Sequence, residues 1–247
     1  MPRIIVNAYT TWDEFKLDSV AELFSDSIFK RGKYLFRGQR NSEWKLTPSF
    51  DRWFLRFSAG RDRVETARRL LTFFKKECEG LDLSISDSVW DDEAQSLALG
   101  QHYGLPTRLL DWSESPYIAA FFAFNEAVLQ GETSDNVAIW ALDTDDSIWT
   151  GEQGVRVVDI PYILGNIRLR NQAGKFTLSK TPFPCLEDYV NYFGEGGVAL
   201  VKFTIPAVEA TRAIADLDAM GISHSRVYPE LVGYTSAAKM RVILTSP

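Results

Sequence analysis

The longest uninterrupted hydrophobic stretch of the chain, residues 117–124, predicts a helix that is buried on nearly all sides. Ser115 and Pro116 precede it and form a strong helix start, because a proline at the first helical position gives up no N–H that the helix needs. Before this start, a glycine and a proline interrupt the chain, and residues 107–113 carry several polar groups. We therefore expect a polar loop supported by a buried helix, which suits a functional site; a well-satisfied core turn is the alternative.

Helical spacing of hydrophobic positions dominates the first half of the chain, and alternation is common in the second half. Helices are expected at residues 11–29, 49–57, 62–81, 86–102, 185–193, 206–220 and 229–241. Strands are expected at residues 3–8, 33–38, 136–142, 155–160 and 198–205, and residues 166–179 read as two strands joined by a tight turn. This segregation favours an α+β fold with a mixed, largely antiparallel sheet. Residues 1–247 are expected to form a single domain, helical over about 1–130 and strand-rich over about 131–247.

The composition is that of an ordinary globular protein, since 45% of the 247 residues are hydrophobic. No hydrophobic run is long enough to cross a membrane, and the N-terminus lacks the plan of a signal peptide. Two cysteines make no disulfide framework. We therefore expect a cytoplasmic protein without a membrane partner.

Charge is distributed unevenly along the chain. Residues 31–63 contain nine lysines and arginines against three acids, a local charge of +6, whereas the whole chain carries −6, so the remainder carries −12. A basic segment in an acidic chain indicates a local anionic ligand, such as a phosphate or a short piece of nucleic acid. Solvated loop charge is the alternative interpretation.

The familiar motifs of nucleotide and metal sites are missing from the sequence. It has no Walker loop, no Rossmann glycine fingerprint, no nucleophile elbow and no cysteines and histidines at metal-binding spacing, so we expect no metal. Several polar side chains instead adjoin strongly hydrophobic segments, namely Arg37, His102, Arg108, Asp111 and Gln172. Burying so many polar groups without a use is costly unless they complete a hydrogen-bond network. Structural interpretations stay open: Arg108 and Asp111 as an ion pair, His102 as the partner of a helix C-terminus, and Gln172 as the partner of a turn.

Five segments of the chain resemble the FRG domain, a bacterial family named after its Phe-Arg-Gly motif. They are Leu-Phe-Arg-Gly-Gln at residues 35–39, Trp-Lys-Leu-Thr-Pro-Ser at 44–49, Gln-His-Tyr-Gly-Leu-Pro-Thr-Arg-Leu-Leu-Asp-Trp at 101–112, and the later segments 168–177 and 228–231. The long block at 101–112 is very specific, whereas the three-letter motif alone is not. The resemblance spans roughly residues 30–240 and implies kinship more firmly than activity.

The order of parts also resembles, more weakly, the ADP-ribosyltransferase plan. This resemblance implies an ADP-ribosyltransferase-like core and NAD as the substrate. Arg37 would hold the phosphate or ribose part of NAD, residues 107–115 would shape the nicotinamide pocket, and Gln172 would bind the ribose at the scissile bond. The chain departs from the plan at Gln172, because a neutral amide stabilises an oxocarbenium-like charge only weakly. Asp111, or another acid brought in by the fold, would substitute for it; otherwise the domain would bind a nucleotide without cleaving it.

Together the resemblances imply a composite site. Its catalytic residues would be Arg37, His102, Asp111 and Gln172, and its substrate-binding residues would be Gly38, Gln39, Gln101, Tyr103, Thr107, Arg108 and Ser113. The favoured hypothesis is an ADP-ribosyltransferase-like or NAD-processing effector that acts on a protein or nucleic-acid target as a toxin or in antiphage defence. One alternative is a non-catalytic module that binds a nucleotide or nucleic acid. A second is a metal-dependent nuclease that uses Asp111.

Overall fold

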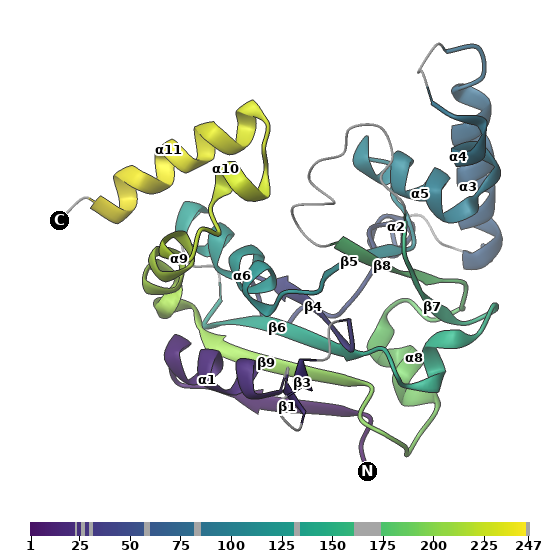
Figure 1. Cartoon of the computed structure of the whole chain (residues 1–247). Coiled ribbons are helices and arrows are strands. Elements are labelled where there is room, and N and C mark those ends of the chain that lie inside the picture. The colour runs from purple at the N-terminus through teal and green to yellow at the C-terminus, as the bar shows by residue number, and fades with distance from the viewer. Residues whose placement is uncertain are drawn as a thin grey trace.

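A seven-stranded sheet runs through the molecule, with helices on its faces and at one end (Figure 1). The structure is a computed structural model that describes residues 1–22, 24–25, 28–29, 32–56, 60–81, 85–130, 134–160 and 174–245. Helices and strands pack into an α+β arrangement, as the sequence predicts, although both halves of the chain supply helices and strands.

The sheet takes strands from both halves of the chain. Its order is β1 (Ile4–Ala8), β9 (Leu200–Pro206), β6 (Asn136–Asp143), β4 (Tyr34–Gln39), β5 (Leu109–Ser113), β8 (Gly174–Ser179) and β7 (Val155–Val158). The β1–β9 pair is parallel, and the other neighbouring pairs are antiparallel. The sheet is therefore mixed and largely antiparallel, as expected. A separate two-stranded ribbon pairs β2 (Phe24–Ser25) with β3 (Ile28–Phe29).

Helices surround the sheet. They are α1 (Trp12–Glu22), α2 (Ser49–Phe54), α3 (Arg63–Glu77), α4 (Asp87–Asp91), α5 (Glu93–His102), α6 (Pro116–Gln130), α8 (Leu186–Tyr192), α9 (Ala210–Ala219), α10 (His224–Val227) and α11 (Leu231–Thr245), with 3-10 turns η1 (Ser147–Thr150) and η2 (Ala207–Glu209). The helices α2 to α5 form a group beside β5 and β8, while α10 and α11 follow α9 (Figure 1). Within the described residues, no helix combines the length and the hydrophobicity that crossing a membrane requires.

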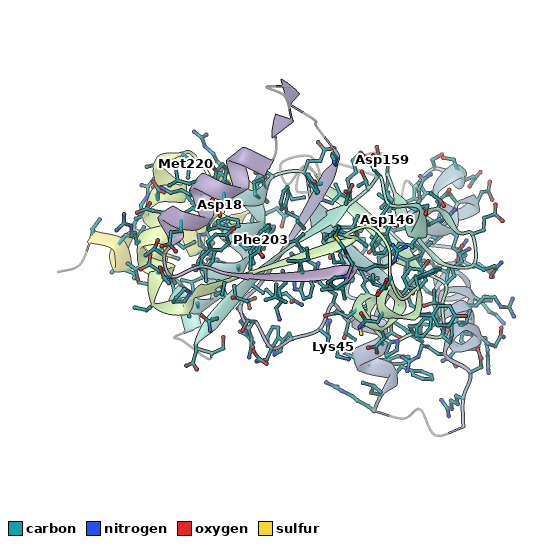
Figure 2. All side chains as sticks on the ribbon, turned by 90° about the horizontal axis from the view of Figure 1, so that it is seen from below. Asp18, Lys45, Asp146, Asp159, Phe203 and Met220 are labelled. Atoms are coloured by element: carbon teal, nitrogen blue, oxygen red, sulfur yellow. The ribbon has the colours of Figure 1, made fainter. Side chains whose placement is uncertain are left out.

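Two large hydrophobic clusters hold these layers together. One packs Phe203 of β9 against Trp12 of α1 and Phe124 of α6, and all three side chains are almost fully buried. The other packs the opposite side of the sheet against α8 and η1. Figure 2 shows Phe203 inside the molecule, whereas Lys45 and Asp159 lie at its surface with side chains 60% and 73% exposed. The sheet thus has hydrophobic material on both faces, which fixes the position of each strand.

The buried helix predicted after Ser115 is confirmed as α6. The Ser115 hydroxyl accepts a hydrogen bond from the N–H of Ile118 at 3.3 Å, and Pro116 occupies the first helical position. No residue from 117 to 124 is exposed. The helix packs across β4 and against α9, so it supports the middle of the sheet.

The polar loop predicted ahead of this helix is wrong, because Leu109–Ser113 form the strand β5. This strand pairs with β8 at every position. Leu110 and Trp112 join one hydrophobic cluster, while Leu109 joins another next to α5. Four of its five residues are buried, on both faces of the strand, and Asp111 is the exposed exception, so the sequence does not alternate in the way that identifies a half-exposed strand.

Two expected helices are also shorter than predicted. The helix expected over residues 11–29 ends at Glu22 and is followed by the β2–β3 ribbon. The helix expected over residues 86–102 breaks at Asp92, whose carboxylate accepts the N–H of Gln95 at 2.8 Å and caps α5. The second strand of the hairpin expected at 166–179 is β8; its first strand lies outside the described residues.

A buried histidine, His224, joins α10 to α6. It is 3% exposed, and its ring lies 4.9 Å from that of Phe121, measured between centroids. Asp218 and Arg241 line the small cavity beside it. Burial lowers the pKa of His224, and the negative charge of Asp218 opposes this effect. The folded state therefore favours the neutral ring.

We expect the free energy of unfolding to decrease as the pH falls below 6.5, the ordinary histidine value. Below that pH the histidine of the unfolded chain becomes protonated, whereas buried His224 of the folded protein stays neutral. The contribution of His224 to stability is therefore fully present above the unfolded pKa, and it is lost as the pH falls toward the lower pKa of the folded state. Urea midpoints measured between about pH 7.5 and 5.5 test this, with His224→Leu expected to flatten the dependence. The matched control is the same change at exposed His102. A His224→Leu protein that keeps the wild-type slope would refute the assignment.

Candidate functional site

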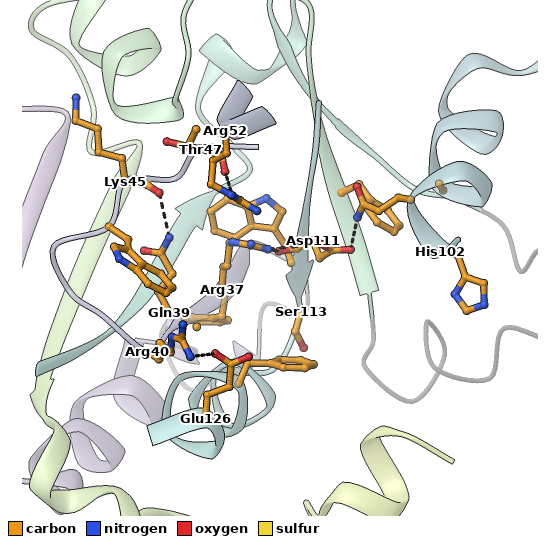
Figure 3. A pocket seen from close by; sticks show the side chains of 18 of the residues that line it. Arg37, Gln39, Arg40, Lys45, Thr47, Arg52, His102, Asp111, Ser113 and Glu126 are labelled. Carbon is orange, nitrogen blue, oxygen red and sulfur yellow. Dashed lines mark hydrogen bonds and ion pairs between the residues drawn. The ribbon is translucent and has the colours of Figure 1, made fainter. Parts of the chain in front are cut away.

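The strands β4 and β5 form the base of the candidate site. Among the described residues they pair at a single position, Phe36 with Ser113, and then separate. A cavity of about 1060 Å³ lies beside this separation. Residues of β4, of the turn after it, and of α2, α5, β5 and α6 line the cavity (Figure 3). Segments that are far apart in the sequence therefore meet at this point.

Arg37 bridges the gap between the two strands. Its Nη1 donates a hydrogen bond to the carbonyl oxygen of Asp111 at 2.7 Å and lies 3.7 Å from Oδ2 of the Asp111 carboxylate. Burial lowers the pKa of Arg37; the charge of Asp111 opposes this effect, and the charge of Arg52 adds to it. An arginine stays protonated in spite of such shifts. The cavity wall thus contains a partly desolvated cation with a second cation nearby.

The second cation, Arg52, comes from α2. Its Nη1 donates to the carbonyl oxygen of Thr47, which fixes the side chain against the turn that leads into the helix. Figure 3 shows the guanidinium groups of Arg37 and Arg52 close together, and the effect of Arg52 on the pKa of Arg37 indicates that the two charges interact. Two neighbouring positive charges repel each other, so this part of the cavity favours an anion.

Asp111 presents the carboxylate that lies next to these arginines. Its side chain is 59% exposed, and its Oδ1 accepts a hydrogen bond from Nε2 of Gln101 at 2.9 Å. The other amide atom of Gln101, Oε1, accepts from the hydroxyl of buried Thr107. The Thr107–Gln101–Asp111 chain therefore holds the carboxylate in a defined orientation, because both polar atoms of the Gln101 amide are hydrogen-bonded.

Other predicted site residues also line the cavity. Gly38, Gln39, His102 and Ser113 do so, in addition to Arg37, Gln101 and Asp111. Gln39 has a structural role, because its Nε2 donates to the carbonyl of Lys45 at 3.1 Å and its Oε1 accepts from Nε1 of Trp140 at 2.8 Å. Ser113 accepts the N–H of Ser115 at 3.0 Å. His102 is exposed at the end of α5, and Figure 3 shows its ring apart from Asp111.

Of the remaining predicted residues, those that the structure describes do not line the cavity. Tyr103 is 76% exposed and projects elsewhere. Thr107 acts on the site only through Gln101. Gln172 lies outside the described residues. The structure thus brings Arg37 and Gln101 into contact with Asp111, leaves His102 at the border, and separates Arg108 from them.

Arg108 belongs to a buried ionic cluster beneath the site. Its Nε donates to the carboxylate of Asp51 at 3.2 Å, and its other nitrogens donate to the carbonyls of Thr181 and Phe183. Asp51 is fully buried and also accepts from Arg63 at 2.5 Å. Burial raises the pKa of Asp51, and both arginines oppose this effect. The expected alternative pair, Arg108 with Asp111, does not form; Arg108 instead ties the start of β5 to α2 and to the segment after β8.

Several residues that line the cavity were not named from the sequence. They include Arg40, Glu43, Trp44, Lys45, Arg52, Glu126 and Tyr228. The basic segment 31–63 contains Arg40, Lys45 and Arg52, so the charge count pointed to the region but not to individual side chains. Glu126 had no signal, because an acid on the exposed side of a helix is ordinary. Within the described part of the chain, no three His, Cys, Asp or Glu side chains lie close enough to hold a metal ion.

A comparison with protein families identifies the segment that builds most of this cavity. Residues 32–131 match the family model of the FRG domain. The chain carries an FRG domain. The match contains the segments 35–39, 44–49 and 101–112, while the later segments that resemble the FRG pattern lie beyond it. No curated protein and no solved structure matches the chain.

The Phe-Arg-Gly motif of the FRG domain places its three residues in different environments. Phe36 is buried in the cluster beneath α6. Arg37, one residue on, points to the other side of the strand and into the cavity. At Gly38 an added Cβ would lie 1.9 Å from the carbonyl oxygen of Ala119, so the strand touches the backbone of α6 there. Close packing against α6 therefore requires a glycine at this position.

Proposed function

We propose that the cavity binds a phosphate-bearing nucleotide, with NAD as the candidate substrate, and that the FRG domain acts as an ADP-ribosyltransferase-like or NAD-processing domain. The observation that carries this proposal is the convergence of Arg37, Arg52 and Asp111 in one cavity. An activity that consumes NAD or modifies a protein or nucleic-acid target would make the domain an effector, as a toxin or in antiphage defence.

The two arginines suit the phosphate groups of such a ligand. Guanidinium groups donate two parallel hydrogen bonds to a phosphate, and an anion between Arg37 and Arg52 would relieve the repulsion between them. Typical small-molecule pockets enclose about 300–1,000 Å³. The volume here, about 1060 Å³, lies just above that range and accommodates an extended ligand such as a dinucleotide.

Asp111 supplies the charge that cleavage of NAD requires. When the bond between the nicotinamide nitrogen and C1′ of the ribose breaks, its electron pair leaves with nicotinamide and an oxocarbenium-like charge develops on the ribose. A fixed carboxylate next to the ribose stabilises that charge. Water then captures C1′ and releases a proton, which gives ADP-ribose, or an acceptor group captures C1′ and becomes ADP-ribosylated. Gln101 keeps the carboxylate oriented during these steps.

The order of elements around the cavity supports the same proposal. Arg37 lies on β4, the neighbouring strand β5 carries Asp111, and the hydrophobic helix α6 follows β5 directly. This succession resembles the ADP-ribosyltransferase plan, in which an arginine-bearing strand precedes a hydroxyl-bearing segment and a hydrophobic helix. With a neutral glutamine at position 172, Asp111 is the acid next to Arg37 that can take the missing role.

A second candidate function is nucleotide binding without turnover. It is favoured by one observation: both carboxylate oxygens of Asp111 already face partners, Gln101 at 2.9 Å and Arg37 at 3.7 Å. A carboxylate engaged in this way serves structure as well as catalysis. No observation in the described residues favours the metal-dependent nuclease.

Nicotinamide release separates the two functions. Wild-type protein incubated with NAD is expected to release nicotinamide, measured by liquid chromatography, and Asp111→Asn is expected to reduce the rate by about 100-fold or more, the usual effect of removing one electrostatic group from an active site. The Asp111→Asn protein should still bind ADP-ribose. Asp159→Asn, an exposed acid outside the cavity, is the matched control.

Each other outcome of this assay has a definite meaning. Release of nicotinamide by Asp111→Asn at the wild-type rate would show that Asp111 is not the stabilising acid. Binding of ADP-ribose by the wild-type protein without any release of nicotinamide would favour the non-catalytic module.

A further inference from the structure

One side of the cavity, away from Arg37 and Arg52, is formed by the Trp44 ring and the Arg40–Glu126 ion pair. Arg40 lies 3.2 Å from the carboxylate of Glu126, and its guanidinium lies 5.0 Å from the centre of the Trp44 ring. Figure 3 shows Arg40 and Glu126 together, apart from Asp111. Trp44 lines the cavity and is 45% exposed. A tryptophan ring on a cavity wall offers a ligand a large, flat hydrophobic surface.

Hydrogen bonds hold Trp44 in place although its ring is exposed. The backbone N–H of Trp44 donates to the carbonyl of Asn41 at 3.2 Å. The Asn41 side chain accepts the backbone N–H of Glu43 at 2.8 Å, which closes a tight turn. The next residue, Lys45, accepts through its carbonyl from Gln39 of β4. The exposed ring therefore sits on a rigid support, and a ligand that stacks on it need not order the turn first.

We infer that Trp44 is the residue on which the base of the nucleotide stacks. This inference rests on the proposed function and specifies which end of the nucleotide lies at which end of the cavity. The guanidinium of Arg40 polarises the ring from nearby, and the exposed part of the ring accepts a planar, aromatic base. The phosphates then extend to Arg37 and Arg52, and the second ribose reaches Asp111. The substrate class is a purine dinucleotide bound with its purine at Trp44.

Glu126 has a positioning role at the same end. Its carboxylate fixes the guanidinium of Arg40, so Arg40 stays over Trp44 instead of turning toward the phosphates. Without this partner, three arginines would compete for the same anion. The cavity thus has a phosphate region at Arg37 and Arg52 and a base region at Arg40 and Trp44.

Calorimetric titration with ADP and with inorganic pyrophosphate tests this inference. Trp44→Ala is expected to weaken ADP binding by about 10- to 100-fold, the loss of one base–aromatic stack, and to leave pyrophosphate affinity unchanged. Trp44→Phe keeps an aromatic face and should lose much less. The matched control is Phe73→Ala, because Phe73 is also exposed and lies 5.8 Å from an arginine, yet is outside the cavity. Thermal melts of all variants establish that they fold.

The outcomes distinguish this inference from the proposed function. If Trp44→Ala binds ADP as the wild type does while Arg37→Ala does not, the base does not stack on Trp44, and the nucleotide site itself stands. If ADP affinity and pyrophosphate affinity fall together in Trp44→Ala, the ring acts on the arginines rather than on the base. If the wild-type protein binds neither ligand, the nucleotide site and the stacking residue are both refuted.

Discussion

Replacing Arg37 with alanine is expected to weaken binding of ADP-ribose by about 30-fold or more, because truncating a hydrogen-bonded charge in a desolvated site costs about 2–5 kcal/mol. Arg37 is only 22% exposed and faces the same cavity as Arg52. The variant removes the cation and also the bridge to the Asp111 carbonyl. Isothermal titration measures the affinity, and a thermal melt measures the effect on folding.

Two further variants sharpen the Arg37 experiment. Arg37→Lys keeps the charge but has no planar fork, so it should bind more weakly than the wild type and more tightly than Arg37→Ala. Arg56→Ala removes an exposed arginine of the same basic segment that does not line the cavity, and its affinity should equal that of the wild type. Equal losses in Arg56→Ala and Arg37→Ala would mean that the segment attracts the ligand only through its overall charge.

Replacing the next residue, Gly38, with alanine is expected to prevent folding or to lower the free energy of unfolding by about 3 kcal/mol or more. The added Cβ would lie 1.9 Å from the carbonyl oxygen of Ala119 and 2.7 Å from the backbone nitrogen of Ala123. Both atoms belong to the backbone of α6, so no side-chain rotation relieves the overlap. Either β4 or the helix must move, and the hydrophobic cluster between them would open.

Urea denaturation of Gly38→Ala against Gly151→Ala measures this effect. At Gly151 the nearest atoms to an added Cβ lie at 3.6 Å, an ordinary van der Waals distance, so that variant should unfold close to the wild-type midpoint. A Gly38→Ala protein with a wild-type midpoint would mean that β4 and α6 do not touch as described. Substitutions at the two adjacent motif residues are thus expected to have different effects: Arg37→Ala weakens ligand binding, and Gly38→Ala destabilises the fold.

The sequence predicted those parts of the fold that follow from local pattern. The start of α6 at Pro116 and the strand that carries Arg37 depend on neighbouring residues alone, and both are confirmed. The strand Leu109–Ser113 was missed because its two faces pack against different hydrophobic clusters, and that information lies in distant segments. The break at Asp92 was missed because an N-cap inside a helical pattern resembles an ordinary polar position.

The candidate site was predictable only in part, for a similar physical reason. Arg37 and Asp111 stood out because each is a charged residue beside a strongly hydrophobic segment. Arg52 and Trp44 lie in segments with no such contrast, and their place in the cavity depends on how α2 and the turn after β4 fold back onto the sheet. Arg108 looked like a site residue for the same reason as Arg37, but its partner is the buried carboxylate of Asp51. Sequence contrast identifies buried charge, and only the fold decides whether a ligand or another side chain faces it.

The most direct measurement of the nucleotide site is a crystal structure of the protein with ADP-ribose bound. We predict that the phosphates lie within hydrogen-bonding distance of Arg37 and Arg52, that the terminal ribose lies next to Asp111, and that the adenine stacks on Trp44. A ligand bound elsewhere on the molecule, or phosphates that contact neither Arg37 nor Arg52, would contradict the assignment of this cavity as the nucleotide site.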